Sequence, residues 1–398
     1  MINMKCSIRN ITAIALVLLV TLAASLSTAT PIHATTATPV YYSDGKTVIG
    51  YLNESNEIVY KLAANPYYNV NYLNYLLGDN VQKTVVFSSG MTIPLRYAIK
   101  PGSNKIIKAT GATIQITTPG RGAIASIKPI TNIKVYGGTW RNIADVAGCT
   151  NSMFRFAHSS NILVDGVDVQ ANVDGHSFEI IACKNVTVRD SKIVAVGSYV
   201  STRYEEQVQI DIATPHTAPR IMEEFGTAYV QGQTCSYIYI INNYIKGARG
   251  VCASFAKADT QFINKFHRDI YIQDNTIVGM TGEGVSLFNT ISATVTGNDI
   301  YSFNKLLSSS YSVGLSVTMF GNISATSISD KRIVIKSNLI KGGRQAVQVY
   351  SHSSSKFGRV YIKYNNMYCR NGASAALKAT KYSIIYLAIE GNHSYKWL

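Results

Sequence analysis

The chain has 398 residues, of which 46% are hydrophobic and only 15% are charged, and its formal net charge is +15. This hydrophobic content supports a sizeable core, and the length allows either two domains or one large all-β domain. Abundant Gly, Ser, Thr, Asn and Tyr residues favour many short strands and turns, and argue against long charged helices.

The N-terminus has the pattern of a secretory signal peptide. Lys5 and Arg9 give a positive start, residues 11–26 form an apolar run, and Ala34 closes a small-residue end. The apolar run is short for a membrane span, so a retained signal anchor is the lesser alternative. We therefore predict that residues 1–34 are cleaved and that the mature protein is secreted, without a membrane span.

The positive charge is concentrated towards the C-terminus. Loss of Lys5 and Arg9 lowers the net charge by two, from +15 to +13, and residues 331–398 hold 12 Lys and Arg against Glu390 alone. This bias favours an anionic partner, such as an acidic polysaccharide, a wall polymer or a membrane surface. A basic surface that keeps the protein soluble explains it equally well. No nucleic-acid motif is present, and nucleic acid is not an expected partner of an exported protein.

Two segments precede the regular part of the chain. Residues 35–60 are rich in Thr, Tyr and Ser without a clear period, which predicts a loose lead-in. Residues 69–79 have apolar side chains at helical spacing and Gly78 near their end, which predicts a short helix over the open end of a β structure. We expect residues 35–84 to be a lead-in and cap, and residues 85–398 to be one all-β domain.

From residue 135 onward a short pattern recurs. An apolar residue is followed by two turn residues, then by a small residue or Asn, and two positions later by another apolar residue. The eight small or Asn positions are Gly138, Val167, Ser191, Asn243, Asn275, Asn298, Asn338 and Asn365. Their spacings are 29, 24, 52, 32, 23, 40 and 27 residues, and a base period in the twenties with insertions is typical of a β-solenoid.

The pattern has a direct physical explanation. In a solenoid each strand stacks on the equivalent strands of neighbouring coils, and an Asn at the same bend can adopt a left-handed conformation and hydrogen-bond along the stack. A β-sandwich would explain the strands but not the Asn position. The insertions at residues 213–234 and 256–267 are expected to form walls around a groove.

Three apolar runs between residues 153 and 212 each carry a central polar residue: Arg155, Glu179 and Gln209. Because strands alternate their faces, these residues point outward if their apolar neighbours point inward. Alignment of the runs places Arg155 beside Glu179, Gln209 above Glu179, and Asp211 two residues further along. Coils lie about 4.8 Å apart, so the backbones of Glu179 and Asp211 would be about 8 Å apart on the diagonal.

Carboxyl groups placed in this way can reach separations of about 5–9 Å, the range that glycosidases use. The predicted catalytic residues are Glu179, Asp211, Glu206 and His176. The predicted substrate-binding residues are Arg155, Gln209, Arg249 and Tyr204. Arg155 can hold an anionic group or lower the pKa of a neighbouring carboxyl group. The alternative is that all of these are ordinary polar residues on the wet face of a sheet.

Three segments carry a resemblance to known proteins. Residues 175–179 read Gly-His-Ser-Phe-Glu and precede Ala-Cys-Lys-Asn-Val, residues 206–211 read Glu-Gln-Val-Gln-Ile-Asp, and residues 154–158 read Phe-Arg-Phe-Ala-His. With the repeat, they resemble the secreted right-handed parallel β-helix proteins of the pectate-lyase-like superfamily over roughly residues 85–394. The resemblance implies a single-stranded right-handed parallel β-helix and action on polysaccharides. Because that architecture hosts lyases, hydrolases, epimerases and adhesins, it does not fix an activity.

The chain also departs from the family. Relatives often carry Arg-Gly-x-Gly-Thr-His where residues 249–254 read Arg-Gly-Val-Cys-Ala-Ser, so a histidine is missing there. The signatures of pectate lyases and polygalacturonases themselves are absent from the sequence.

Two classes of function remain open. In a glycoside hydrolase the carboxyl groups would be the general acid and the base or nucleophile, and no cofactor is expected. In a polysaccharide lyase, carboxylates would hold Ca²⁺, and Arg155, His176 or Arg249 would take the α-proton. The second class is a non-catalytic, wall-associated glycan-binding protein. In each case the expected partner is a polysaccharide, an acidic one if the basic charge is functional, and the protein is expected to be a monomer.

Cysteine usage does not indicate a disulfide framework. The five cysteines that follow residue 34 are Cys149, Cys183, Cys235, Cys252 and Cys369. An odd count leaves at least one thiol unpaired, so the fold is not expected to depend on disulfides. Cys183 and Cys235 precede equivalent strands and would have Cα atoms about 5 Å apart, within disulfide range. A stack of two reduced thiols is the favoured interpretation.

Overall fold

The computed structural model describes residues 37–126, 129–144 and 151–398. The predicted signal peptide and Cys149 lie outside these residues. Across the described ranges, no helix combines the length and the apolar character needed to cross a membrane.

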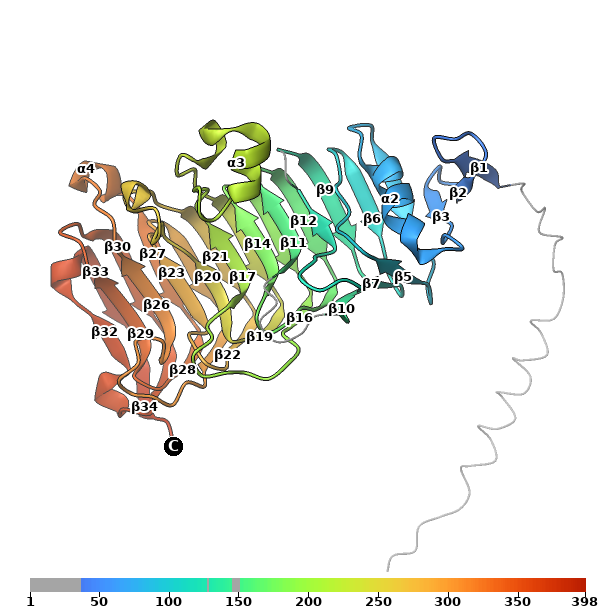
Figure 1. The fold of residues 1–398 in the computed structure, drawn as a ribbon. Helices are drawn as coiled ribbons and strands as arrows, with labels where there is room; N and C mark the ends of the chain where they lie inside the picture. The colour runs from blue at the N-terminus through green and yellow to red at the C-terminus, as the bar shows by residue number, and fades with distance from the viewer. Residues whose placement is uncertain (1–36, 127–128, 145–150) are drawn as a thin grey trace, which may run out of the picture. The chain divides into compact units, whose positions relative to one another are not determined.

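Strands of successive coils line up into three sheets, named A, B and C below (Figure 1). Sheet A has 14 strands: β1 (Thr38–Tyr41), β2 (Val48–Leu52), β3 (Ile58–Tyr60), β4 (Lys83–Val86), β6 (Lys105–Lys108), β9 (Thr131–Tyr136), β12 (Ser160–Asp165), β15 (Lys184–Arg189), β18 (Ser236–Ile241), β21 (Arg268–Gln273), β24 (Ala293–Thr296), β27 (Arg332–Lys336), β30 (Phe357–Lys363) and β33 (Ile384–Glu390).

Sheet B has 11 strands: β5 (Thr92–Leu95), β7 (Thr113–Ile116), β10 (Thr139–Asn142), β13 (Asp168–Gln170), β16 (Lys192–Val194), β19 (Tyr244–Gly247), β22 (Thr276–Gly279), β25 (Asp299–Ser302), β28 (Leu339–Gly342), β31 (Asn366–Cys369) and β34 (His393–Lys396). Sheet C has nine: β8 (Ile124–Ala125), β11 (Ser152–Ala157), β14 (His176–Ile181), β17 (Glu206–Asp211), β20 (Arg249–Ala253), β23 (Val285–Phe288), β26 (Val313–Met319), β29 (Gln345–Ser351) and β32 (Leu377–Ala379).

Helices are few in the described residues and lie outside the sheets. The α-helices are α2 (Asn69–Leu77), α3 (Pro219–Phe225) and α4 (Ala325–Ile328). The short 3₁₀ turns are η1 (Pro66–Tyr68), η2 (Thr227–Val230), η3 (Thr260–Phe262), η4 (Ala373–Ala375) and η5 (Lys381–Ser383).

Each full coil gives one strand to each sheet, and the strands pair in parallel from coil to coil. The inward residues repeat at equivalent positions: Ile162, Val186, Ile238 and Ile270 are in register and unexposed. Their stacking builds one continuous apolar core. The predicted fold is confirmed: the stacked coils form a right-handed parallel β-helix.

The predicted helix at the N-terminal end is confirmed, and the loose lead-in is wrong. Helix α2 packs against β4 and β5 and buries Val70, Leu73, Leu76 and Leu77. Residues 38–60 form β1, β2 and β3, of which β2 and β3 pair antiparallel. These three strands are too short for a periodic pattern to show in the sequence. They extend sheet A and so cover the edge that β4 would otherwise expose.

The recurring Asn position forms a buried ladder, as predicted. In Asn243, Asn275, Asn298, Asn338 and Asn365, each Nδ2 donates to the Oδ1 of the next member at 2.9–3.0 Å. The left-handed conformation was predicted at the wrong residue. It lies one position earlier, for example at Asp274 with φ 56° and Ser337 with φ 56°. The reason is that Asn298 Nδ2 also donates to Thr296 O at 2.9 Å, so the residue between them makes the bend.

This ladder predicts a stability difference between buried and exposed asparagines. Asn298→Ala should lower the free energy of unfolding by about 2–4 kcal/mol, because it leaves buried amide groups without partners. Asn161→Gly is the control, since Asn161 joins an exposed ladder with Asn132 and Asn185 and Gly tolerates its left-handed φ of 55°, and it should cost less than about 1 kcal/mol. Urea denaturation measures both values, and equal losses would contradict a stabilising role specific to the buried ladder.

Candidate active site on sheet C

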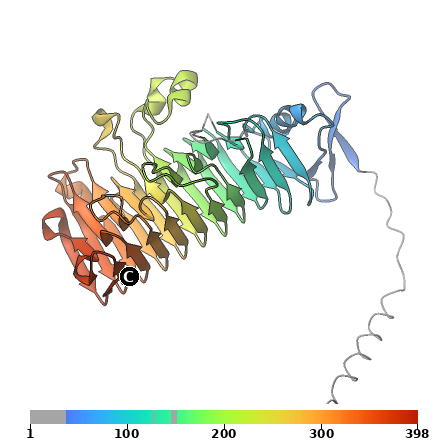
Figure 2. The same ribbon diagram turned by 60° about the horizontal axis from the view of Figure 1, so that its bottom comes forward.

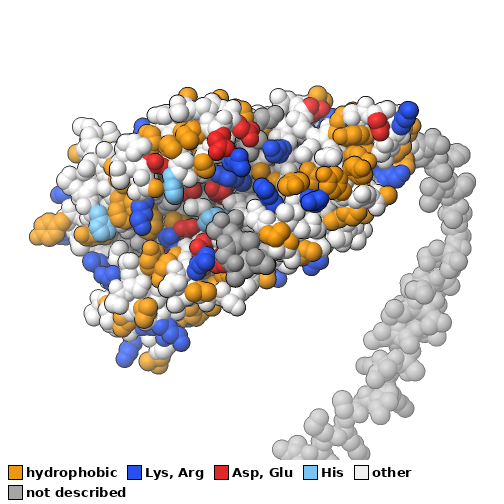
Figure 3. Space-filling view, viewed as in Figure 1, with side chains coloured by type: hydrophobic (Ala, Val, Ile, Leu, Met, Phe, Trp, Pro, Cys, Tyr) orange, Lys and Arg blue, Asp and Glu red, His pale blue; other side chains and the backbone are white. Residues whose placement is uncertain are grey.

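Sheet C places the predicted polar residues on one outward face, as the sequence alignment indicated. Arg155 pairs with Glu179 and Glu179 pairs with Gln209 in consecutive strands. Asp211 pairs with Ile181, so it lies one coil and two residues from Glu179. Acidic and basic side chains gather in the hollow of this face below α3 (Figure 3).

Glu179 is an ion-paired carboxylate at the centre of β14. Only 9% of the residue is exposed. Its Oε2 atom lies 3.2 Å from Arg155 Nε and accepts a hydrogen bond of 2.6 Å from Ser152 Oγ. Arg155 Nη2 donates in turn to Thr217 O at 3.1 Å, which ties the first insertion to the site. One oxygen of Glu179 therefore has both a cation and a hydroxyl donor beside it.

Asp211 is the perturbed acid of the cluster. It is 2% exposed, and one oxygen accepts a hydrogen bond from Ser254 Oγ. Burial and then the neighbouring Glu179 carboxylate raise the pKa of Asp211 to about 7, with a smaller contribution from Glu206. The Ser254 hydrogen bond and His176 act in the opposite direction. Asp211 is therefore a carboxyl group that can hold a proton near neutral pH.

Glu206 begins β17 and belongs to a buried ionic network. Arg249 Nη1 lies 2.6 Å from Glu206 Oε1, and Arg249 Nε lies 2.9 Å from Glu283 Oε2. His176 Nδ1 lies 2.7 Å from the backbone oxygen of Glu206 and 3.7 Å from its Oε2. Since a carbonyl oxygen only accepts, Nδ1 carries the proton and Nε2 is the nitrogen left to act as a base.

Arg249 cannot act as the base that the lyase hypothesis allowed. Burial acts to lower the pKa of Arg249, but Cys252, Glu283 and Glu206 outweigh it and raise that pKa above its ordinary value. The guanidinium also donates to Ser286 Oγ at 2.9 Å. Arg249 lines the groove, and its bonds show that it holds Glu206 and Glu283 in position.

Glu283 was missed in the sequence. It is 3% exposed, and burial raises its pKa while Arg249 opposes that shift. The sequence does contain a signal for it: Arg249-Gly-Val and Glu283-Gly-Val are equivalent segments of successive coils, since Val251 pairs with Val285. Ser152 and Ser254 were also missed, since single serines in a Ser-rich chain give no signal.

Two insertions wall the groove on one side, and both project from the same edge of the solenoid (Figure 2). The first, residues 213–234, carries α3 and η2, and His158 Nε2 lies 2.6 Å from its Tyr229 O. The second, residues 256–267, is tied to the first because Asp259 Oδ2 accepts from the backbone N–H of His216 at 3.1 Å. On the other side Tyr204 stacks on Tyr311 with ring centres 3.9 Å apart, so one face of Tyr204 is covered.

Two cavities lie along this face. The N-terminal cavity has about 590 Å³ and is lined mainly by polar residues, among them Lys100, Arg121, Asn151, Ser152, Arg155, Glu179, Arg220 and Glu224. The C-terminal cavity has about 480 Å³ and is lined by Glu206, Arg249, Cys252, Ser254, Phe255, Lys257, Glu283, Phe288, Ser310, Tyr311, Ser316, Thr318, Phe320, Gln348 and His352. Asp211 lies between them, because Glu179 lines the first and Ser254 the second.

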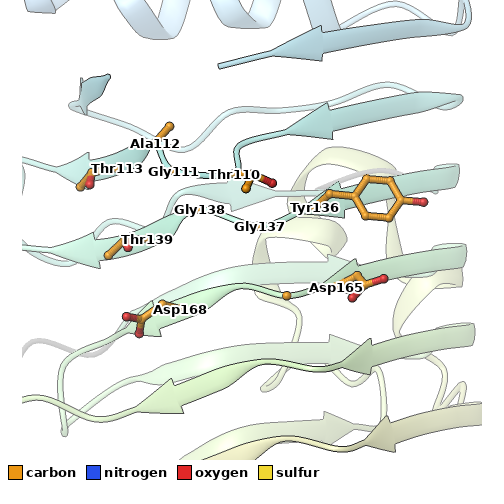
Figure 4. Close-up of a pocket in the computed structure, with 11 residues that line it drawn as sticks. Thr110, Gly111, Ala112, Thr113, Tyr136, Gly137, Gly138, Thr139, Asp165 and Asp168 are labelled. Carbon is orange, nitrogen blue, oxygen red and sulfur yellow. The ribbon is translucent and has the colours of Figure 1, made fainter. Parts of the chain in front are cut away.

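A further cavity, of about 490 Å³, lies at the bend between sheets A and B. Figure 4 shows Asp165 and Asp168 at opposite ends of it, with Thr and Gly residues between them. Asp165 is ion-paired with Arg189 at 2.6 Å. With no acid–base pair brought together, this cavity is a weaker candidate for chemistry than the sheet C groove.

The sheet C carboxylates do not fit a Ca²⁺ site. In the described part of the chain, no three His, Cys, Asp or Glu side chains converge into a group that could hold a metal ion. Arginine nitrogens also stand beside Glu179, Glu206 and Glu283, where a cation would need oxygen ligands. We derive no catalytic step through Ca²⁺.

The described cysteines are free thiols. Cys183 and Cys235 stack in register beside the site, and the Cys183 N–H donates to Cys235 Sγ at 3.3 Å. Burial raises the pKa of both thiols, so they are unreactive core residues.

The buried Asp211 predicts a pH effect on stability. Its pKa rises from 3.8 to about 7 on folding, so the folded protein keeps a proton that the unfolded chain loses. The contribution of this proton to the free energy of unfolding is complete below about pH 4 and is lost as pH rises through about 7. Asp211→Asn should therefore gain stability relative to the wild type between pH 5 and pH 8 in urea denaturation. A difference that is constant with pH would contradict the raised pKa.

No family model and no curated protein matches the chain. Among solved structures, PfbA, a surface adhesin of Streptococcus pneumoniae, aligns with a TM-score of 0.51 at 16% identity, covering 75% of each chain. Endo-xylogalacturonan hydrolase from Aspergillus tubingensis aligns at 0.46 and 10% identity, covering 85% of this chain and 92% of that one. Alginate lyase from Paenibacillus sp. strain FPU-7 aligns at 0.32 and 13%, covering 83% and 97%. The adhesin alignment supports the fold alone: the protein is a right-handed parallel β-helix.

Proposed function

We propose that the protein is a secreted carbohydrate-active enzyme that hydrolyses a polysaccharide in the groove of sheet C. The observation that supports this most is the environment of Asp211. A buried carboxyl group with a pKa near 7 lies beside an arginine-paired carboxylate, Glu179, between two cavities on one face. Pairs of carboxyl groups whose environments separate their pKa values are the general feature of acid–base catalysis at neutral pH.

In this proposal Asp211 is the general acid and Ser254 connects it to the groove. A serine hydroxyl can rotate to donate or accept. When Asp211 is protonated, it donates to Ser254 Oγ and leaves the serine hydrogen free to turn towards the C-terminal cavity. Ser254 can then pass its proton to the leaving glycosidic oxygen while it receives the proton of Asp211. This relay accounts for an acid that is itself only 2% exposed.

Glu179 is the second carboxyl group of the reaction. It is paired with Arg155, and it lines the N-terminal cavity directly. It can therefore act as the base for water or as the nucleophile. Glu206, held by Arg249, keeps negative charge near Asp211 and helps to raise its pKa. His176 orients Glu206 through its backbone oxygen. In a lyase, His176 Nε2 would be the base, and an unsaturated product would reveal it.

A second function is glycan binding without cleavage. The ionic network of Glu206, Arg249 and Glu283 is largely buried and would also stabilise a rigid binding groove. The surface adhesin of similar fold is consistent with this alternative.

Amide variants separate catalysis from binding. Glu179→Gln and Asp211→Asn should each reduce turnover by at least about 100-fold, because each removes a proton-transfer group. Glu223→Gln is the matched control, since Glu223 is exposed on α3 and pairs only with Arg220 among the described contacts. New reducing ends on a panel of acidic and neutral polysaccharides measure hydrolysis, and ultraviolet absorbance detects lyase products. Unchanged turnover in both site variants would overturn the assignment, and binding without turnover by the wild type would favour the second function.

The pH profile tests the identity of the acid. Activity should fall as pH rises through about 7, since Asp211 then loses its proton. In Ser254→Ala the hydrogen bond that lowers this pKa is gone, so the residual activity should fall at a higher pH than in the wild type. A falling limb that stays in place, or one near pH 4, would contradict Asp211 as the acid.

A further inference from the structure

The two cavities of sheet C differ in chemistry, and this difference indicates what the groove binds. They lie on either side of the Asp211 position along the stack of coils: the first lies over β8, β11 and β14, and the second over β20, β23, β26 and β29. A chain molecule laid along the groove would therefore place different units in the two cavities.

The N-terminal cavity is electropositive. Its lining has four cations, Lys100, Arg121, Arg155 and Arg220, against the two anions Glu179 and Glu224. Two of these cations are paired, Arg155 with Glu179 at 3.2 Å and Arg220 with Glu223 at 2.9 Å, which leaves Lys100 and Arg121 against Glu224. Arg121 lies over the ring of Tyr97, with its guanidinium carbon 5.5 Å from the ring centre, and so stands at the cavity wall. The remaining positive charge suits an anionic group on the bound unit.

The C-terminal cavity is largely apolar, and its two cations, Arg249 and Lys257, stand against the two anions Glu206 and Glu283. Phe320 stacks between Phe255, at 3.9 Å, and His352, at 4.9 Å, and Phe288 meets the same stack edge-on. The Arg249 charge is balanced by Glu206 and Glu283, whose carboxylates also line the cavity. A carboxylate bound here would face two buried carboxylates, whereas a neutral unit with an apolar surface would contact the rings.

We infer that the groove binds a mixed polysaccharide, with an acidic sugar in the N-terminal cavity and a neutral sugar bearing deoxy, methyl or acyl groups in the C-terminal cavity. This inference rests on the proposed function only for the cleavage of a bond between the cavities. Which sugar each cavity prefers is a property of binding alone. Both cavities have the size of small-ligand sites, which is about 300–1,000 Å³.

Calorimetry on the Asp211→Asn protein tests the inference without turnover. The probes are oligosaccharides in which a uronic acid alternates with a 6-deoxyhexose, the same oligosaccharides with their carboxyl groups reduced to alcohols, and oligouronates. The alternating probe should bind at least about tenfold more tightly than either of the others, which corresponds to 1.4 kcal/mol or more.

Variants assign each preference to its cavity. Lys100→Gln with Arg121→Gln should remove the preference for the acidic over the carboxyl-reduced probe. Phe255→Ala should remove the preference for the alternating probe over oligouronate, while Phe255→Leu retains most of it and controls for folding. Lys184→Gln with Lys192→Gln makes the same charge change on sheets A and B and should alter neither preference.

The outcomes distinguish the two proposals. Equal binding of all probes, or loss of both preferences in the Lys184 and Lys192 control, would overturn the inference. If the preferences are found but wild-type protein leaves the alternating probe intact, the inference on binding stands and the proposed hydrolysis fails.

Discussion

The register of the stacked coils is the constraint on which the rest of the structure depends. A shift of one residue in one coil would turn every inward side chain of that strand outward. The buried asparagine ladder prevents this, because each amide bonds to the next coil and also closes its own bend. The ladder begins at Ser191, whose backbone N–H donates to Asn243 Oδ1 at 3.0 Å, and it is regular in the coils that follow. The strands that carry Glu179, Asp211 and Arg249 are therefore fixed relative to one another.

Fixed register also explains how a few carboxyl groups acquire unusual environments. In parallel coils, equivalent outward residues lie one strand spacing apart, about 4.8 Å, so their side chains are close together even when they are short. Asp211 thus lies close to Glu179 and Glu206 and is buried. Like charges and burial act in the same direction on its pKa. Arg155 and Arg249 pair with the neighbouring carboxylates, whereas no cation pairs with Asp211 among the described ion pairs.

Much of this could be predicted from the sequence, because a solenoid converts sequence spacing directly into spatial neighbours. The positions of Arg155, Glu179 and Gln209 in one column followed from aligning repeats, and so did Asp211 beside them. The same alignment places Glu283 one coil beyond Arg249, but their ion pair is a side-chain contact that the period does not encode. Ser254 could not be found in this way, because its importance depends on its hydrogen bond to Asp211. The conformation of the bends was misplaced by one residue, since the asparagine that recurs is the one that closes the bend and not the one that turns it.

The central claim is that Asp211 holds a proton near neutral pH, and infrared spectroscopy can observe that proton directly. Difference spectra between the wild type and Asp211→Asn, recorded as pH is raised from 5 to 9, isolate the carbonyl stretch of the protonated Asp211 carboxyl group. The account predicts that this band disappears with a midpoint near pH 7. A group already ionised at pH 5, with no such band at any pH in the series, would contradict it.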